Sequence, residues 1–363
     1  MSPAMKALIA APPTPHSITA YPDPDESLIG YMFRLAKLRH LRNARSTMTG
    51  CGFRQFTNQP ERSWLEALSA DARIPVADLE AISFGPPDRS FGVFRGMALP
   101  GSLFDRRGGS QRRVCPECLA EKPFHRAIWD LRFVAACPFH LKFLMDTCQA
   151  CRKPLRWQGN DPARCTCLRG DLTRMQAEPL TEAEIRGTKA IYGLLGHEAF
   201  RDEAGHVRSL IPFRDMTDAA IVDFLCRIGM TLISGGELNF TLARSGEYLW
   251  QFHEALTRGL ELAEEWPDAF FEILDRATRW TGKYRYAPTA GLFTAIGRWL
   301  DEFPRGQGVV MREVLLEYRH RPNDGPVHFE TRRSLPRKPR DGTLNETPST
   351  HLGPNRRRPV RPK

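Results

Sequence analysis

The residues with the clearest chemical role are cysteines that occur in closely spaced pairs. Seven of the nine cysteines, together with one histidine, form four such pairs: CPEC at 115–118, CPFH at 137–140, CQAC at 148–151 and CTC at 165–167. A pair of this spacing in a tight turn can point both side chains at one metal ion, and two such turns complete a tetrahedron. Thiolate and imidazole ligands in that geometry are typical of zinc. The spacing therefore predicts zinc binding.

Taken in chain order, the pairs divide into C-x2-C-x18-C-x2-H and C-x2-C-x13-C-x-C. The predicted ligands of the first ion are Cys115, Cys118, Cys137 and His140, and those of the second are Cys148, Cys151, Cys165 and Cys167. Both sets reach four ligands, whereas a catalytic zinc keeps one position open for water. We therefore expect two structural zinc ions, with a single ion as an alternative.

Disulfide bonds and redox chemistry are the competing explanations for these cysteines. A cytoplasmic compartment and the CxxC pairing both argue against disulfides. A thioredoxin-like redox site would need one CxxC at the start of a helix, whereas this chain has four linked pairs. Three other residues of the same types are not expected to bind metal. His125 in KPFHRAIW has no partner at the right spacing and is predicted to be packed or polar, and Cys51 and Cys226 are predicted to be small buried hydrophobic residues.

The segments around the cysteine pairs suggest short strands. AIWDLRFVAAC alternates, with Trp129, Leu131 and Phe133 on one face, which predicts a strand leading into the second pair. LKFLMDTC and KPLRW are further strand candidates around the third pair. Such small units have little core of their own, so metal binding is expected to supply much of their stability.

The N-terminal part is expected to be helical. ESLIGYMFRLAKLRHLRN shows an amphipathic helical pattern. SWLEALSADARIPVADLEAISF resembles a helix–turn–helix whose turn contains Arg73-Ile74-Pro75. A second helix that reads bases should carry Arg, Lys, Asn or Gln, but this one carries Asp78 and Glu80. A helical hairpin used for packing or protein contact is therefore favoured.

The chain after residue 172 is predicted to be helical throughout. Thr181–Glu184 forms a capping box, and Pro267 is expected at the first position of a helix. The patterns TDAAIVDFLCRIG, AGLFTAIGRWLDEF and VVMREVLLEYRHR are helical as well. The sequence shows no phosphate-binding glycine loop, nucleophile elbow or DNA-cutting carboxylate set that spacing supports. We therefore expect a protein that is not an enzyme.

The net charge of +10 is unevenly distributed. Residues 331–363 carry ten Lys or Arg against two acids, so the other 330 residues sum to about +2. Within those residues, the window Ser27–Pro60 contains no acid and several cations. The candidate phosphate contacts of this window are Arg34, Lys37, Arg39, Arg42 and Arg45.

No run of eighteen apolar residues predicts a membrane span, and the first residues lack the apolar stretch of a signal peptide. We expect a cytoplasmic, nucleoid-associated protein. The predicted fold class is mainly α with small β elements, comprising a helix–turn–helix region, a tandem zinc-finger core and a helical region. The expected organisation is a flexible leader (1–20), an N-terminal helical region (21–105), the zinc-finger core (106–172), a C-terminal helical domain (173–322) and a disordered basic tail (323–363).

Three segments together resemble the TniQ family, which is related to TnsD. YPDPDESLIGYMFRLA is similar to the family's N-terminal opening, and LELAEEWPDAFFEILDR is similar to a helix found later in it. CPECLAE…W…CPFHLKFLMDTCQACRKPL…CTC resembles its paired zinc-finger core. The resemblance covers about residues 20–320 and is most specific in the core. It implies the same two ligand sets that the spacing gives.

The resemblance further implies a function. Members of this family help to choose the target site of a transposon, and they recruit a AAA+ ATPase of the TnsC/TniB type that engages the transposase. Some read a DNA site themselves, and others are delivered by a CRISPR RNA-guided effector complex. The expected partners are therefore the ATPase, target DNA and, as open alternatives, the guided complex and a second copy in a homodimer.

Two other functions fit the sequence. A zinc-stabilised transcription regulator would bind a specific DNA sequence without any ATPase. A pure protein scaffold would have no affinity for DNA. The chain is longer than minimal family members and shorter than TnsD-type members, so the route to target DNA stays open.

Overall fold

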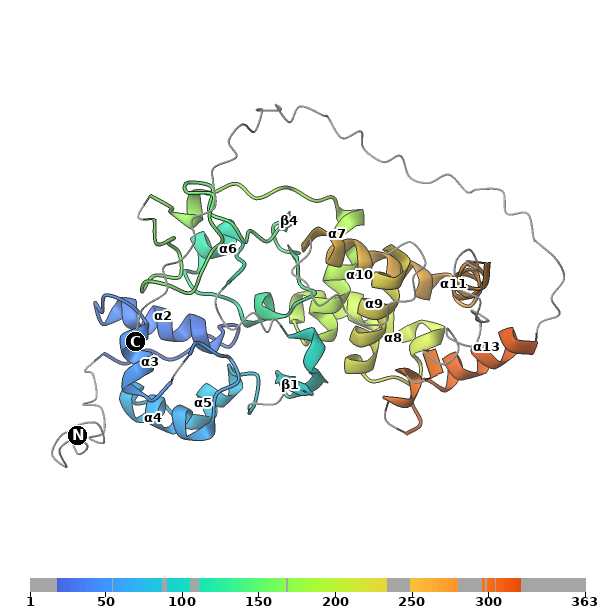
Figure 1. Ribbon diagram of the computed structural model, residues 1–363, viewed down its shortest axis with the longest axis horizontal. Coiled ribbons are helices and arrows are strands. Elements are labelled where there is room, and N and C mark those ends of the chain that lie inside the picture. Colours follow the sequence, from blue (N-terminus) through green and yellow to red (C-terminus); the bar gives the residue numbers. More distant parts are fainter. Residues whose placement is uncertain are drawn as a thin grey trace, which may run out of the picture. The chain divides into compact units, whose positions relative to one another are not determined.

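The N-terminal third of the chain folds into short helices around their own core. The computed structural model describes residues 18–53, 55–86, 90–104, 111–167, 169–233, 249–279, 296–297, 299–303 and 305–320. Its first helices are α2 (Leu28–Leu38), α3 (Arg45–Gly50), α4 (Arg62–Ala72) and α5 (Val76–Ala81) (Figure 1). The α2 helix begins where Ser27 Oγ accepts a hydrogen bond from the Gly30 amide at 3.0 Å. The predicted N-terminal helix is therefore present.

The two predicted helices of the helix–turn–helix region are α4 and α5, and they meet at the expected turn. Arg73 ends α4 in the left-handed conformation with φ of 56°, and Pro75 precedes α5. Leu65, Leu68 and Leu79 are buried, as the pattern predicts. The α5 helix has only six residues and carries Asp78 in its first turn. The arrangement is a helical hairpin, and a DNA-reading role for it stays a prediction.

The middle of the chain contains little regular structure. A hairpin of β1 (Phe91–Phe94) and β2 (Met97–Pro100) turns at Arg95 and Gly96, both with positive φ. The remaining elements are η1 (Gly101–Leu103), α6 (Pro116–Glu121), η2 (Ala127–Asp130), β3 (Ala136–Cys137), β4 (Lys142–Phe143) and η3 (Leu172–Arg174). The two-residue strands β3 and β4 pair antiparallel. Strands of this length provide few hydrogen bonds, so side-chain contacts must hold the region.

The strand predicted from the alternation of Trp129, Leu131 and Phe133 is wrong over most of its length. Residues 127–130 form the 3-10 helix η2, and only Ala136–Cys137 is extended in a sheet. All three side chains are fully buried. Successive turns, with Leu131 N donating to Ile128 O and Val134 N to Leu131 O, bury them without a strand. Of the other two candidates, only Lys142–Phe143 forms a strand.

The C-terminal part is helical, as predicted. Its elements are α7 (Glu182–Leu194), η4 (Glu198–Phe200), α8 (Arg201–Ser209), η5 (Ile211–Phe213), α9 (Asp218–Ile233), α10 (Leu249–Glu264), α11 (Asp268–Arg279) and α13 (Val309–His320). Thr181 and Glu184 make the predicted capping box at α7. The α11 helix begins at Asp268, so Pro267 stands one position before the predicted one. Half of the helix expected in AGLFTAIGRWLDEF lies outside the described residues.

One buried cluster connects the cysteine-rich middle to these helices. It extends from Phe84 through Trp129, Cys137 and Tyr192 to Met311. A second cluster fills the N-terminal helices and includes Trp157 from the cysteine-rich part. The described residues belong to one compact unit, and the division at residues 172/173 stays a prediction. Most of the predicted leader and all of the predicted tail lie outside them.

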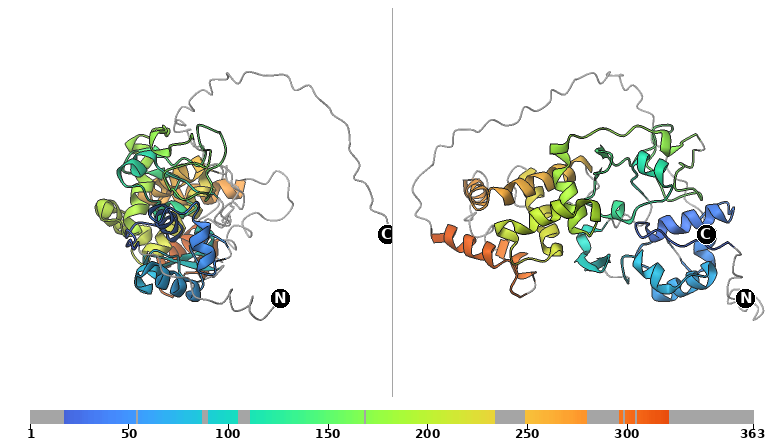
Figure 2. Two further views of the ribbon diagram at one scale, coloured as in Figure 1. Left: turned by 90° about the vertical axis from the view of Figure 1, so that its left-hand side faces the viewer. Right: turned by 180° about the vertical axis from the view of Figure 1, so that it is seen from behind.

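Helices α9 and α10 lie side by side in the C-terminal part (Figures 1 and 2). Their closest approach is at Gly229, where an added Cβ would stand 1.8 Å from the carbonyl oxygen of Ala255. No side chain fits there, so glycine sets the spacing of the pair. None of the described helices combines the length and the apolar character that crossing a bilayer requires.

Substitution of this glycine tests the packing. Gly229→Ala should lower the free energy of unfolding by about 1–3 kcal/mol, because the methyl group forces α9 and α10 apart. Gly205→Ala is the matched control, since Gly205 lies in α8 with no atom within 4 Å of its added Cβ. The control should be neutral or more stable by up to about 1 kcal/mol. Urea denaturation of both variants measures the difference, and an equal effect would contradict the packing argument.

Candidate metal centres and basic surface

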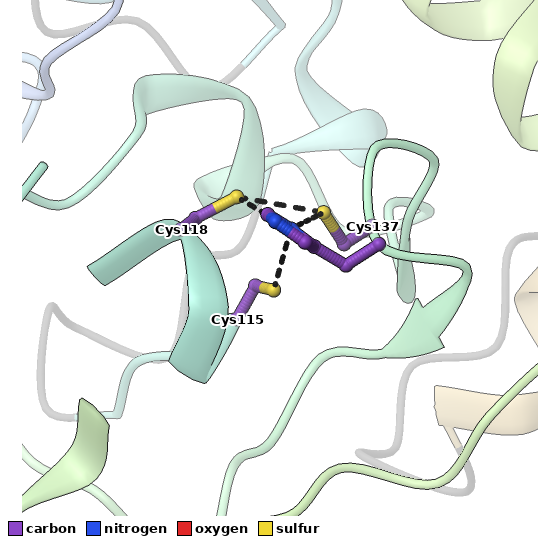
Figure 3. A group of neighbouring side chains, drawn as sticks. Cys115, Cys118 and Cys137 are labelled. Atoms are coloured by element: carbon purple, nitrogen blue, oxygen red, sulfur yellow. Dashed lines mark hydrogen bonds between the residues drawn. The ribbon is translucent and has the colours of Figure 1, made fainter. Parts of the chain in front are cut away.

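The structure brings the four residues of the first predicted set together. Cys115 and Cys118 stand at the start of α6, where Pro116 occupies the first turn, and Cys137 ends β3. Figure 3 shows their three thiols pointing toward one another. His140 follows Cys137 in the turn before β4. The four ligand atoms lie within 4.8 Å of one another.

The distances within this cluster suit a tetrahedral ion. Cys118 Sγ lies 3.6 Å from Cys137 Sγ, and Nδ1 of His140 lies 3.4–3.6 Å from the three sulfurs. A tetrahedron with Zn–S bonds of about 2.3 Å has sulfur atoms about 3.7 Å apart. The cluster could therefore hold a zinc ion with small adjustments.

Carboxylates surround the first cluster and orient its ligands. Nε2 of His140 lies 2.9 Å from Glu121 Oε1, which leaves Nδ1 directed at the sulfurs. A carboxylate on the outer nitrogen fixes the tautomer and the ring orientation of a ligating histidine. Glu117 accepts a hydrogen bond from the Cys115 thiol and pairs with Lys142. Sequence reasoning missed both glutamates, although Glu117 lies inside the CPEC motif and Glu121 three residues beyond it.

The thiols of the first cluster differ in acidity. Hydrogen bonds with Cys115 and Cys137 lower the pKa of the Cys118 thiol to about 4, and Arg126 adds its attraction. Hydrogen bonds with Cys115 and Cys118 raise the pKa of Cys137 well above its ordinary value. A metal ion would displace the protons that remain on the other thiols. Metal affinity should therefore rise with pH.

The second predicted set also converges. Cys148 Sγ lies 3.8 Å from Cys167 Sγ, and Cys151 Sγ lies 3.9 Å from Cys165 Sγ. All four sulfurs are within 4.8 Å of one another. Gly170 closes the turn beneath them, where an added Cβ would stand 2.8 Å from Cys148 Sγ. Only glycine fits at this position.

The residues not expected to bind metal lie outside both clusters. His125 is fully buried, with its ring centroid 5.2 Å from that of Trp129 and 4.6 Å from that of Trp157. Its Nε2 lies 2.9 Å from Asp130 Oδ1. It is a packed histidine, as the spacing argument indicates. Cys51 and Cys226 are buried among apolar side chains.

Two of the five candidate phosphate contacts are paired with buried carboxylates. Arg34 donates to both carboxylate oxygens of the buried Glu26 and to the carbonyl of Tyr21. Arg39 is only 8% exposed, and its guanidinium pairs with the buried Asp71. A cation held in this way cannot reach a phosphate without leaving its own carboxylate uncompensated. We therefore remove both from the predicted patch.

The other three candidates are exposed. Lys37 pairs with Asp161 at 2.8 Å, and its side chain remains 46% exposed. Arg42 and Arg45 are exposed at the end of α2 and the start of α3. Asp161 belongs to the loop of the second cysteine cluster, so the patch borders that cluster. The sequence pattern gave no sign of this contact, because 124 residues separate the two partners.

Comparison with known families gives one match. Residues 17–144 match the family model TniQ. No curated protein sequence matches the chain. The matched segment includes helices α2 to α5, the β1–β2 hairpin and the first cysteine cluster, and it ends just before Cys148. The family resemblance is confirmed over these residues.

Metal analysis of purified variants tests the two centres. We expect two zinc ions per chain, one for each cluster. Cys137→Ser and Cys165→Ser should each retain one ion, because each change leaves three ligands at one centre. Cys226→Ser is the control and should retain both. Elemental analysis by mass spectrometry gives the ratios, and two ions in Cys137→Ser would rule out the first centre.

Stability measurements test the reassignment of Arg39. Arg39→Gln should lower the free energy of unfolding by about 3–5 kcal/mol, because it leaves Asp71 buried and unpaired. Arg42→Gln removes an exposed cation from the same region and should stay within about 0.5 kcal/mol of the original protein. Chemical denaturation measures both. Equal stability of the two variants would contradict the buried Arg39–Asp71 pair and support Arg39 as an exposed phosphate contact.

Proposed function

We propose that the protein is a non-enzymatic adaptor for target-site selection in bacterial DNA transposition. The proposal starts from the TniQ domain of residues 17–144, which places this chain in the TniQ family. A TniQ domain implies a role in target selection at the level of the family. The finer proposal is that this chain connects target DNA to a AAA+ ATPase, which in turn engages the transposase. Target DNA is reached directly or through an RNA-guided complex.

The observation that carries the proposal is the family match, which includes the whole first cysteine cluster. The ligands Cys115, Cys118, Cys137 and His140 all fall inside residues 17–144. A structural ion at this position would rigidify a region with very short strands. A rigid region of this kind suits a protein that positions partners relative to one another.

The described clusters also support a role without catalysis. Each centre has four protein ligands, so neither has the open position that a catalytic zinc offers to water or substrate. The carboxylates nearest the first centre, Glu117 and Glu121, are paired with Lys142 and His140. Their geometry is that of groups that support the ligands.

A pull-down with the transposition ATPase tests this proposal. DNA sequencing on either side of the gene first shows whether a AAA+ ATPase and an integrase are encoded beside it. The tagged full-length chain should then retain that ATPase in the presence of ATP. Cys137→Ser should retain much less, because it loosens the core around the first centre, whereas Cys226→Ser should behave like the original protein.

Two results would contradict the adaptor proposal. Failure of the intact, metal-loaded chain to retain the ATPase would remove the connecting role. Tight binding to one specific DNA sequence, with no ATPase gene nearby, would indicate a zinc-stabilised transcription regulator. The helical hairpin α4–α5 is the segment that such a regulator would use.

A further inference from the structure

We propose that residues 37–45, 152–167 and 169–174 form one cationic surface, here called the knuckle surface, that binds the phosphate backbone of duplex DNA. Residues 152–167 and 169–174 are treated below as one segment. The choice of DNA as partner rests on the proposed function. The second segment is the new part of this surface, because it carries the second cysteine cluster and lies outside the family match, whereas residues 37–45 lie inside it. The α4–α5 hairpin is not part of it.

The two segments are fixed to each other by direct contacts. The Ala44 amide donates to the Gly159 carbonyl at 2.8 Å, and Asn160 Nδ2 donates to the Leu41 carbonyl at 2.5 Å. Lys37 pairs with Asp161 across the same junction. Below these contacts, Trp157 packs against Phe33 with ring centroids 5.0 Å apart. The two segments therefore present their exposed side chains as one unit.

Charge on this surface is strongly unbalanced. Arg39 points inward and does not contribute. The exposed cations are Lys37, Arg42, Arg45, Arg152, Lys153, Arg156, Arg164, Arg169 and Arg174. The acids within the two segments are Asp161, which pairs with Lys37 and Arg164, and Asp171, which pairs with Arg174. Asp146 is exposed at the margin, where its carbonyl accepts from the Leu155 amide.

A metal ion in the second cluster would not cancel this excess. Four thiolates and a divalent zinc ion carry a net charge of −2. Six cations of the surface have no carboxylate partner among the described residues: Arg42, Arg45, Arg152, Lys153, Arg156 and Arg169. Exposed and unpaired cations at this density attract a polyanion at long range. The surface is therefore electrostatically suited to DNA.

The backbone under the cations is held in place from inside. Arg112 is 2% exposed, and it donates to the carbonyls of Pro162 and Arg164 at 2.6 and 2.8 Å. Its guanidinium also lies 5.3 Å from the ring centroid of Trp157. One buried arginine thus fixes the loop that carries Arg164 and the strand-like segment that carries Arg156. A preformed loop loses less entropy when it binds.

Duplex DNA fits the surface better than a single strand does. Proteins that bind single strands stack bases on exposed aromatic rings. The two segments contain one Phe, Tyr or Trp, Trp157, and it is buried in the N-terminal core, which leaves His40 as the one exposed ring of the described residues there. Arginine forks and lysines without a stacking platform suit contacts to backbone phosphates. The expected binding is therefore to duplex backbone, with little sequence preference.

The salt dependence of binding tests the proposal. Fluorescence anisotropy with a short DNA duplex, and with one of its strands alone, is measured for the full chain between about 50 and 200 mM salt. Lys153→Gln/Arg156→Gln and Arg42→Gln/Arg45→Gln should each reduce the slope of log K against log salt by about 1.8, since each phosphate contact contributes about 0.9. The four changes together should reduce it by about 3.6. The tail beyond residue 330 is present in every variant, so its contribution cancels.

The control removes the same charge elsewhere. Arg201→Gln/Arg214→Gln changes two exposed arginines of the C-terminal helical part and should leave the slope unchanged. Unchanged zinc content and circular dichroism establish that the variants are folded. The proposal would be overturned if the control lost as much of the slope of log K against log salt as the knuckle variants do, or if the knuckle variants kept the original slope. Tighter binding of the single strand than of the duplex would also overturn it.

This experiment separates the surface from the adaptor role. DNA binding is measured without the ATPase, and the ATPase pull-down is done without DNA. If the unmodified full chain retains the ATPase but shows no salt-dependent binding to DNA, the knuckle surface alone is refuted. The predicted slopes without ATPase retention would refute the adaptor role and leave the surface in place.

Discussion

The convergence of three thiols and one imidazole at the first cluster is the constraint on which the middle of the protein depends. The strands that carry Cys137 and flank His140 are two residues long, and their single pairing cannot define a sheet. The side chains beside them, such as Val114, Leu119 and Leu131, are nevertheless almost fully buried. A bound ion would contribute about 10–16 kcal/mol to folding at such a site. That contribution would account for a core built with so little regular structure.

The same region fixes the parts on either side of it. The Ser27 amide, at the start of α2, donates to the carbonyl of His125, and the Ala127 amide donates to the carbonyl of Asp25. On the other side, Phe139 packs against Tyr192 of α7 with ring centroids 6.0 Å apart. Helices that precede and follow this region in the sequence, α2 and α7, therefore contact the loops that the first cluster organises. Loss of a bound metal ion should therefore destabilise residues well beyond its ligands.

Local signals were readable from the sequence, and contacts between distant residues were not. The cysteine pairs and the Thr181–Glu184 capping box depend on spacings of a few residues, so their geometry follows directly. The partners of Arg34 and Arg39 lie 8 and 32 residues away, and no periodicity reveals them. The strand predicted from the alternation at Trp129 is wrong for a related reason. Every side chain there is buried, so the pattern carries no information about a solvent face.

The arginines show why a charge count predicts so little about binding. Arg34, Arg39 and Arg112 are held by carboxylates, carbonyls or a ring, and they stabilise the loops and helices that contain them. The inward pairing of Arg34 and Arg39 removes two cations from the predicted patch. At the same time, the Ala44–Gly159 contact adds the exposed cations of a second segment to it. The local surface is thus more basic than the +2 sum for residues 1–330 suggests, because its two segments bring together nine exposed cations and only two acids. Phosphate binding would depend on this division between paired and unpaired cations, which only the fold defines.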